Sequence, residues 1–154
     1  MDYFSFFEKN IGVLSLEEQN KLKNSKVAII GLGGIGGIAL EVLARTGIEN
    51  FVICDKDKFE PSNFNRQILA TLDFIGKSKV QAGLKRLKKI NKNVKVKVFG
   101  KMEKKNVMKI IDGVDVVVDG LDNLRDRIIL ARACRKKKIP YVFGSAARDI
   151  GMST

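Results

Sequence analysis

The chain has no histidine and only two cysteines, Cys54 and Cys134. Without histidine, no imidazole is present to act as a general base near neutral pH. The cysteines do not form a C-x-x-C pair, so we expect no structural zinc site within this chain. Both thiols are expected to be buried structural groups, because free cysteine is usually buried. Any reaction therefore has to use carboxylates, amides, cationic side chains and backbone N–H groups.

Long hydrophobic runs are also missing. The longest stretch without a charged residue, Val27–Leu40, includes five glycines. It is shorter than the ~20 apolar residues that a membrane-spanning helix needs. Acidic residues near the amino terminus, such as Asp2 and Glu8, argue against a signal peptide. We therefore expect a soluble, cytoplasmic protein without a membrane partner.

Acidic residues are scarce relative to basic ones, and the formal net charge is +12. Basic residues gather in the segments Lys85–Lys89 and Arg135–Lys138. Such a surface attracts acidic partners, among them nucleotides, an acidic carrier protein or RNA. Solvated helix faces would give the same composition. Neither segment has the interleaved aromatic residues of a single-strand binding platform.

Apolar segments rich in β-branched residues alternate with helical segments, which is typical of βαβ units on a parallel sheet. We predict strands at Lys26–Gly31, Phe51–Cys54, Val94–Phe99, Val114–Asp119 and Tyr141–Phe143, and helices at Leu16–Asn24, Gly34–Thr46, Lys77–Ile90, Glu103–Ile111 and Asn123–Lys138. The fold class is then α/β, a Rossmann-like doubly wound sheet that is mainly parallel, with about five strands and helices on both faces. Residues 1–154 are expected to form a single domain. Ligands of such sheets bind at the carboxyl ends of the strands.

The final segment reads like a further strand that follows Phe143, with the sequence F-G-S-A-A-R-D-I-G-M-S-T. A sheet that ended there would have an unpaired edge. We expect another segment or subunit to cover that edge, because exposed edges invite pairing with other chains.

A glycine-rich turn directly follows the first predicted strand. Gly31, Gly33 and Gly36 satisfy the pattern G-x-G-x-x-G, and Gly34 lies between the last two. In this pattern the first glycine permits a tight turn, the second lets phosphate approach the backbone, and the third lets helix pack on strand. The context indicates a nucleotide. A tight turn without a ligand is the simpler alternative.

Two acidic residues follow the second predicted strand. Asp55 lies 19 positions after Gly36, where a carboxylate can accept hydrogen bonds from ribose hydroxyl groups. This placement suits NAD and ATP equally. Asp57 either assists Asp55 or is simply solvated.

The polar run S-N-F-N-R-Q separates these two nucleotides. It begins at Ser62, supplies neutral donors at Asn63 and Asn65, and places a guanidinium group at Arg66. Cleavage of ATP needs cations around the triphosphate because the leaving pyrophosphate gains charge, whereas the diphosphate of NAD is satisfied by the glycine turn. Lys79 begins the next helix and can reach the same phosphates. ATP is therefore favoured, although a solvated loop would have a similar composition.

Asp122 and Asn123 follow the fourth predicted strand and open a helix. An aspartate at such a position is often only a helix cap. Facing a triphosphate, the same carboxylate would hold Mg²⁺, which binds one or two carboxylates together with phosphate oxygens. With the preceding motifs present, we predict Asp122 as the metal ligand.

In this combination the motifs resemble those of the ThiF/MoeB/HesA family, the bacterial and archaeal relatives of ubiquitin-activating E1 enzymes. The likeness covers residues 11–154 and includes Gly76-Lys77-Ser78-Lys79 and Arg127, four positions after Asn123. The resemblance implies ATP- and Mg²⁺-dependent adenylylation of the C-terminal carboxylate of a ubiquitin-like sulfur-carrier protein of the ThiS or MoaD type, with release of pyrophosphate. It also implies a homodimer.

By position, the resemblance assigns phosphate contacts to Gly34 and to the run from Ser62 to Arg66, the ribose to Asp55, the α-phosphate region to Lys79, and the metal and reacting centre to Asp122 and Asn123. Arg66, Lys79 and Asp122 would be the catalytic residues. Two departures stand out. Lys9 takes the place of an amino-terminal arginine that reaches into a partner subunit, and the chain lacks the family's C-terminal part.

Three other functions remain open. One is an E1-like relative that modifies tRNA, which the basic surface would suit. Another is an NAD(P)-binding oxidoreductase domain, which would leave Arg66 and Lys79 without a role. The third is a nucleotide-binding partner subunit without catalytic activity.

Overall fold

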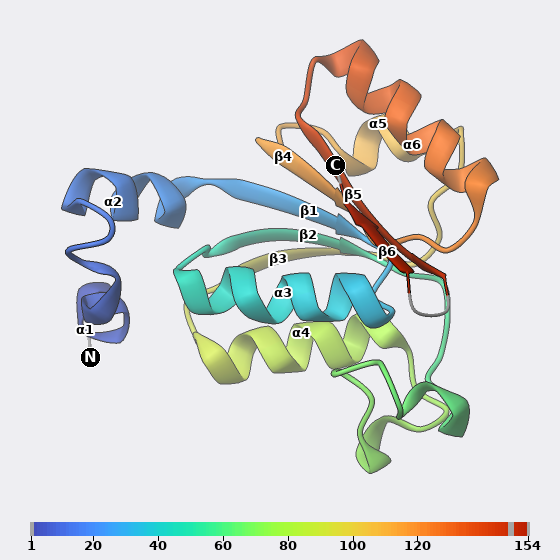
Figure 1. Cartoon of the computed structure of the whole chain (residues 1–154), viewed down its shortest axis with the longest axis horizontal. Helices are drawn as coiled ribbons and strands as arrows, with labels where there is room; N and C mark the ends of the chain where they lie inside the picture. Colours follow the sequence, from blue (N-terminus) through green and yellow to red (C-terminus); the bar gives the residue numbers. More distant parts are fainter. Residues whose placement is uncertain (1, 148–149, 154) are drawn as a thin grey trace.

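The apolar segments form one six-stranded sheet with the order β3-β2-β1-β4-β5-β6 (Figure 1). The computed structural model describes residues 2–147 and 150–153. The strands are β1 Lys26–Ile30, β2 Asn50–Cys54, β3 Lys95–Phe99, β4 Val116–Asp119, β5 Tyr141–Ala147 and β6 Ile150–Ser153. Strands β1 to β5 are parallel, whereas β6 pairs antiparallel with β5. The predicted Rossmann-like fold is confirmed.

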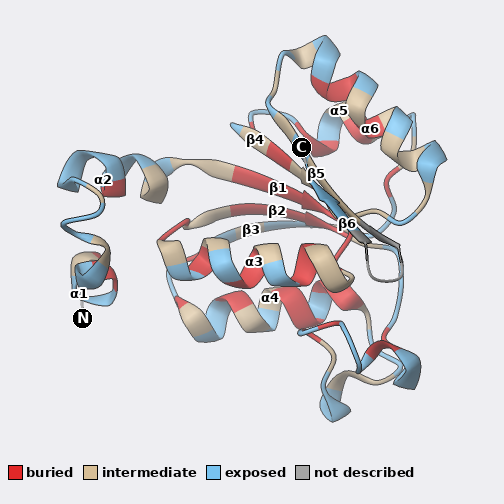
Figure 2. Cartoon of the chain, viewed as in Figure 1, coloured by how far each residue is buried: buried red, intermediate tan, exposed pale blue. Residues whose placement is uncertain are grey.

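Alternate residues of the central strands feed two separate cores, because successive side chains of a strand point to opposite faces. Val27 and Ile29 of β1 belong to one apolar cluster, together with Leu40. Ala28 and Ile30 of the same strand belong to the other cluster. Figure 2 shows buried residues on both the central strands and the inward sides of the helices. Burial on both faces explains why these strands read as continuous apolar runs.

Helices cover both faces of the sheet (Figure 1). On one face lie α3 Gly34–Thr46 and α4 Lys79–Ile90, and on the other lie α5 Val107–Ile110 and α6 Leu124–Lys137. Short 3-10 helices, η2 Pro61–Asn63 and η3 Leu72–Phe74, occur in the connection between β2 and α4. This connection carries the polar run of the sequence and returns the chain to the carboxyl end of the sheet.

The helix predicted at Glu103–Ile111 is wrong in its first half. The Asn106 side chain accepts a hydrogen bond from the backbone N–H of Glu103 at 2.7 Å and donates to the carbonyl of Lys101 at 2.9 Å. Side chains such as asparagine compete with helical hydrogen bonds in this way. Residues before Val107 therefore form a turn, and only α5 remains helical.

The last two strands extend the predicted sheet. β5 continues past Phe143 to Ala147, and β6 occupies part of the segment in which a further strand was expected. Residues 148, 149 and 154 of that segment lie outside the described residues. β6 is consequently one edge of the sheet, beside β5.

The amino-terminal segment lies at the other end of the sheet from the carboxyl ends of the strands (Figure 1). It comprises α1 Tyr3–Phe7, η1 Glu8–Asn10 and α2 Leu16–Asn24, of which α1 and η1 were not predicted. The hydroxyl group of Tyr3 donates to the carbonyl of Gly47 at 2.9 Å, and the amide of buried Gln19 donates to the carbonyl of Thr46 at 2.9 Å. These bonds tie the segment to the C-terminal end of α3. Among the described residues, no helix has the length and apolar character required to cross a membrane.

Candidate nucleotide site

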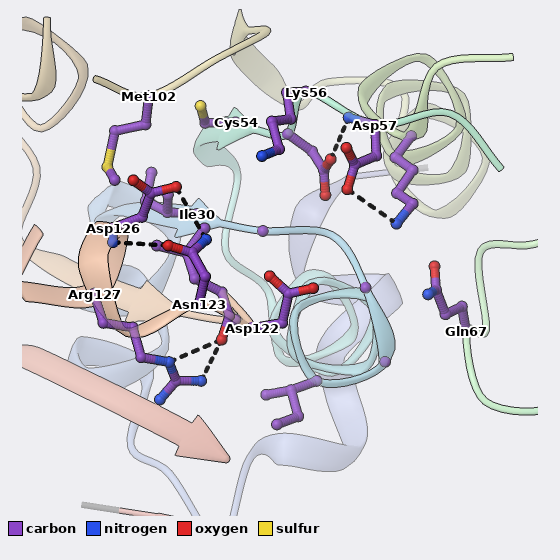
Figure 3. Close-up of a pocket in the computed structure, with 18 of the residues that line it drawn as sticks. Ile30, Cys54, Lys56, Asp57, Gln67, Met102, Asp122, Asn123, Asp126 and Arg127 are labelled. Atoms are coloured by element: carbon purple, nitrogen blue, oxygen red, sulfur yellow. Dashed lines mark hydrogen bonds and ion pairs between the residues drawn. The ribbon is translucent and has the colours of Figure 1, made fainter. Parts of the chain in front are cut away.

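The carboxyl ends of the parallel strands surround a cavity of about 310 Å³. Its lining comes from the turn after β1, the segments after β2, β3 and β4, the start of α4 and α6, and β5. The lining residues used below are Gly31, Gly33, Gly34, Cys54, Asp55, Lys56, Asp57, Arg66, Gln67, Lys79, Lys101, Met102, Gly120, Asp122, Asn123, Asp126 and Arg127. Figure 3 shows Asp122 near the centre of this cavity, between Asn123 on one side and Gln67 on the other.

The turn after β1 requires glycine for steric reasons. Gly31 has a φ of +90°, and a Cβ atom there would lie 2.7 Å from the carbonyl group of Gly120. A Cβ atom at Gly36 would overlap the carbonyl oxygen of Gly31. Gly31, Gly36 and Gly120 therefore form one close backbone contact between β1, α3 and the end of β4. This contact leaves the N-terminal end of α3 facing the cavity, as an anion-binding turn requires.

Gly34 is the place where the polar loop meets the glycine turn. A Cβ atom at Gly34 would lie 3.3 Å from the carbonyl oxygen of Arg66. Because glycine leaves this space free, the loop after β2 packs directly on the first turn of α3. Gly33 lines the cavity beside this contact, whereas Gly36 lies behind the turn and is not part of the lining.

Asp55 holds the shape of the cavity through both carboxylate oxygens. Oδ2 accepts a hydrogen bond from the backbone N–H of Leu32 at 2.6 Å, and Oδ1 accepts one from Asp57 at 2.8 Å. Burial raises the pKa of the Asp55 carboxyl group, and these two N–H bonds oppose the rise. Each oxygen retains a further lone pair, so the group can still accept a hydrogen bond from a ligand.

Lys79 is a buried cation at the start of α4, with only 7% of its surface exposed. Its ammonium group lies 3.8 Å from the Asp57 carboxylate, and its backbone N–H donates to the Asp57 carbonyl at 3.0 Å. Pairing between Phe59 and the segment before α4 fixes this position, with the Phe59 N–H donating to Lys77 at 3.0 Å. The structure therefore holds a buried ammonium group at the cavity beside the carboxylates of Asp57 and Asp55, and this positive charge suits a phosphate group.

The run from Ser62 to Arg66 supplies one side chain to the cavity and uses the others to support it. Nη1 of Arg66 donates to the Ser62 carbonyl and to Oδ1 of Asn65, each at 2.9 Å. Asn63 is buried, and its Oδ1 accepts from the Glu60 backbone at 3.1 Å. Ser62, Asn63 and Asn65 do not line the cavity, whereas Arg66 does. Among the described residues, the other N–H groups of this guanidinium make no hydrogen bond.

The segment after β4 leaves Asp122 unengaged. Asn123 is the N-cap of α6, and its Oδ1 accepts from the Asp126 backbone at 2.9 Å. Within the described part of the chain, the exposed Asp122 carboxylate makes no hydrogen bond or ion pair. Arg127 donates to the carbonyls of Leu121 and Gly144, which ties this segment to β5. The capping role considered for Asp122 thus belongs to Asn123.

Both cysteines are buried and free, as expected. Cys54 lines the cavity, and burial raises the pKa of its thiol to about 12. Burial likewise raises the pKa of Cys134 to about 11. Neither thiol forms a thiolate near neutral pH, so neither is an activated nucleophile.

Gln67 is a cavity residue that the sequence did not single out. It is 7% exposed, and its Oε1 is buried without a hydrogen-bond partner among the described residues. A buried polar atom without a partner is costly, and native proteins seldom keep one without a reason. Together with the glycine turn and Lys79, this orphaned oxygen indicates a polar ligand. The cavity therefore suits a polar ligand such as a nucleotide.

We predict opposite effects of Gln67→Leu on stability and on binding. Leucine removes the unpaired oxygen, so the ligand-free protein should be as stable as the wild type or more stable by about 1 kcal/mol. Binding of MgATP should weaken about tenfold if the ligand satisfies this amide. Thermal melts and calorimetric titration check the two effects. Loss of stability with unchanged MgATP affinity would mean that the amide is structural.

The predicted residues thus fall into two groups. The cavity brings together Gly31, Gly33, Gly34, Asp55, Asp57, Arg66, Lys79, Asp122 and Asn123, whereas Gly36, Ser62, Asn63 and Asn65 lie outside its lining. Residues added by the structure include Lys56, Gln67, Lys101, Met102 and Asp126. Gln67 ends the predicted polar run, which was a usable signal. Met102 and Lys101 follow β3 and carry no motif.

Comparison with known proteins gave one family and several similar proteins. The model of the ThiF family matches residues 7–154. The chain is 35% identical to the SAMP-activating enzyme E1 of Haloferax volcanii over 90% of the chain and 52% of that protein. It is 34% identical to the molybdopterin-synthase adenylyltransferase of Haemophilus influenzae, covering 90% of the chain and 57% of the relative.

The tRNA threonylcarbamoyladenosine dehydratase of Bacillus subtilis is 35% identical over 93% of the chain and 57% of that protein. Among solved structures, the E. coli tRNA N6-threonylcarbamoyladenosine dehydratase in complex with ATP matches with a TM-score of 0.91 and 31% identity. That match covers 96% of this chain and 62% of the other. The chain thus spans about half to three fifths of the length of these proteins.

Proposed function

The chain belongs to the ThiF family, and we propose that it binds ATP and Mg²⁺ and transfers the adenylyl group to a carboxylate with release of pyrophosphate. The observation that carries this proposal is the grouping of Arg66, buried Lys79 and unengaged Asp122 around one glycine-lined cavity. Two cations suit a triphosphate, and a free carboxylate opposite them suits a metal ion.

We assign the residues of the cavity as follows. Asp55 accepts hydrogen bonds from the ribose, and the backbone at Gly33 and Gly34 faces phosphate. Arg66 and Lys79 neutralise phosphate oxygens. Ser62 and Asn65 hold the guanidinium group of Arg66 in place, and the Asn63 carbonyl accepts from the Arg66 backbone N–H. Asp122, with Asn123 beside it, would hold Mg²⁺. When bound, the metal ion would neutralise charge on phosphate oxygens and so favour departure of pyrophosphate.

The reaction needs no protein nucleophile. An oxygen of the acceptor carboxylate attacks the α-phosphorus, the bond from that phosphorus to the bridging oxygen breaks, and pyrophosphate leaves with the electron pair. The chain's residues position the reactants and balance the developing charge. This mechanism agrees with a chain that has no histidine and whose two thiols are protonated.

For the acceptor, we propose first the C-terminal carboxylate of a ubiquitin-like sulfur carrier. Relatives named as adenylyltransferases, such as that of Haemophilus influenzae, support adenylyl transfer. A carboxylate carried by tRNA is the second candidate. The likeness to the dehydratases and the six basic residues of α6 favour it.

We also propose that the protein acts as a homodimer. Lys9 lies in η1, at the end of the sheet away from the cavity (Figure 1). It therefore has no access to the cavity of its own chain. A second copy would have to supply this charge, and a dimer would be visible by light scattering.

An exchange assay tests the proposed function. Wild-type protein with Mg²⁺, a carrier that ends in Gly-Gly and labelled pyrophosphate should return label to ATP. Arg66→Ala should reduce this exchange by about 10²-fold or more, because a charged phosphate contact is lost. Arg45→Ala is the matched control, since Arg45 is on α3 and pairs with Glu41 away from the cavity.

The alternatives give different results. Stabilisation by NAD⁺ and indifference to MgATP would contradict the proposal in favour of an oxidoreductase domain. Tight binding of MgATP without exchange, with either acceptor, would favour a partner subunit that does not catalyse.

A further inference from the structure

The carboxylate of Asp119, at the end of β4, is buried but has no part in the proposed function. None of its surface is exposed, and it does not line the nucleotide cavity. The other buried charged residues, Glu41 and Lys79, each form an ion pair. In the described part of the chain, no lysine or arginine pairs with Asp119. A buried charge without a counter-ion is costly, so the hydrogen bonds that it makes need an explanation.

Both carboxylate oxygens of Asp119 accept a hydrogen bond. Oδ1 accepts from the backbone N–H of Leu121 at 2.8 Å, and Oδ2 accepts from the hydroxyl group of Tyr141. Tyr141 is on the neighbouring strand β5, where it pairs with Val117. Asp119 is two residues after Val117, so its side chain and that of Tyr141 share one face of the sheet and meet on the diagonal. Asp119 thus joins β5 to the turn after β4.

The turn after β4 carries Asp122 between two anchored residues. Leu121 is held on both sides, because its N–H donates to Asp119 and its carbonyl accepts from Nε of Arg127 at 2.9 Å (Figure 3). Asn123 is fixed as the N-cap of α6. Since Asp122 makes no described contact of its own, the backbone on either side decides the direction of its side chain.

We propose that Asp119 and Tyr141 are positioning residues for Asp122. The Tyr141 hydroxyl holds the Asp119 carboxylate, which holds the N–H of Leu121 and so aims the next side chain into the cavity. The inference rests on the proposed function, in which Asp122 is the ligand of Mg²⁺. Neither Asp119 nor Tyr141 lines the cavity, so any effect of either on ligand binding has to pass through the turn.

The experiment measures the affinity for ATP by calorimetric titration, once with Mg²⁺ and once with EDTA. The ratio of the two affinities is the metal-dependent gain. Tyr141→Phe keeps the ring and removes the hydroxyl group. It should lower this gain about tenfold, because partners that orient a metal ligand have effects of this size. Affinity in EDTA should stay within about twofold of the wild type, since Asp55, Arg66 and Lys79 are untouched.

A double-mutant cycle shows whether Tyr141 acts through Asp122. In the background Asp122→Ala, adding Tyr141→Phe should change the metal-dependent gain less than about twofold. The titrations need no turnover. A wild type with a metal-dependent gain that Asp122→Ala removes, but without pyrophosphate exchange, would therefore count against adenylyl transfer and leave this inference standing.

A variant at the other end of α4 controls for lost stability. Asn91 is buried, and its Nδ2 donates to the Glu49 carboxylate at 2.8 Å. It lies outside the nucleotide cavity and outside a second cavity that adjoins it. Asn91→Leu and Tyr141→Phe should each lower the melting temperature by about 2–4 °C. Only Tyr141→Phe should lower the metal-dependent gain.

Substitutions of Asp119 separate position from charge. In Asp119→Asn the amide oxygen can accept from Leu121 and the NH₂ group can donate to the Tyr141 oxygen. This variant should keep the metal-dependent gain within about twofold, whereas Asp119→Ala should lose at least as much as Tyr141→Phe. If Asp119→Ala does not fold, Tyr141→Phe and Asp119→Asn still decide the matter.

Four results would overturn the inference. Tyr141→Phe with a lower melting temperature but the full metal-dependent gain would make the hydroxyl a core hydrogen bond only. An equal loss of gain in Asn91→Leu would point to general destabilisation. A tenfold loss in Asp119→Asn would show that charge acts, and not position. An undiminished effect of Tyr141→Phe in the Asp122→Ala background would exclude action through Asp122.

Discussion

Lys79→Met is expected to weaken MgATP binding and to reduce adenylyl transfer by about 10²–10³-fold. The lysine is 7% exposed, and its described ionic partner, Asp57, lies 3.8 Å away. A buried ammonium group in this position would gain a charge-assisted contact when a phosphate group arrives. Methionine keeps the length of the side chain and removes the charge. Calorimetric titration with MgATP and pyrophosphate exchange measure the two losses.

The stability of the ligand-free Lys79→Met variant separates a binding role from a structural one. If the ammonium group serves the ligand, its removal should leave the free energy of unfolding unchanged or raise it. Lys77→Met is the control, because Lys77 is exposed two residues before α4 and outside the cavity lining. A Lys79→Met variant that binds MgATP as tightly as the wild type would contradict the proposed site.

Gly36→Ala should destabilise the fold by about 3 kcal/mol or more and should abolish nucleotide binding. The added Cβ atom would overlap the carbonyl oxygen of Gly31 and lie 2.9 Å from its carbonyl carbon. These are backbone atoms at the junction of β1 and α3, so no side-chain rotation can relieve the overlap. The start of α3 would have to move away from the cavity. Urea denaturation and MgATP titration check the two effects.

The neighbouring glycine gives a control within the same turn of α3. A Cβ atom at Gly37 would meet only side-chain atoms of Ile68 and Leu69, at 3.4 Å or more. Gly37→Ala should therefore be neutral or stabilise the protein by about 0.5–1 kcal/mol, because alanine reduces the freedom of the unfolded chain. Equal destabilisation by both substitutions would show that the close contact at Gly36 is not the cause.

The order of strands and helices was predictable because local residue patterns encode it. Strands β1 and β2 are buried on both faces and read as apolar runs, and the glycine turn places the start of α3 correctly. The short α1 was missed, and the first half of the helix expected at Glu103–Ile111 was wrong. In those segments single side chains, such as Asn106, decide which backbone groups are paired.

The candidate site was predictable only in part. Asp55 and Asp122 follow strands, and Lys79 begins a helix, each at a position that its motif marks. The parallel sheet brings these positions to one edge. The direction of a side chain depends instead on competing hydrogen bonds. Asn63 turns inward to the Glu60 backbone, whereas Oε1 of Gln67, beside the glycine turn, has no hydrogen-bond partner among the described residues.

By itself, the sequence determined the ThiF-family fold, the glycine turn and the residue types available for chemistry, since all of these depend on local pattern. Only the tertiary structure decided that Asn123 caps α6 and so leaves Asp122 free, and that Lys101 and Met102 join the cavity. It also placed Arg125 of α6 in the lining of a second cavity, beside the first. Such proximities arise when strands distant in sequence end at the same edge of a sheet, and no local pattern records them.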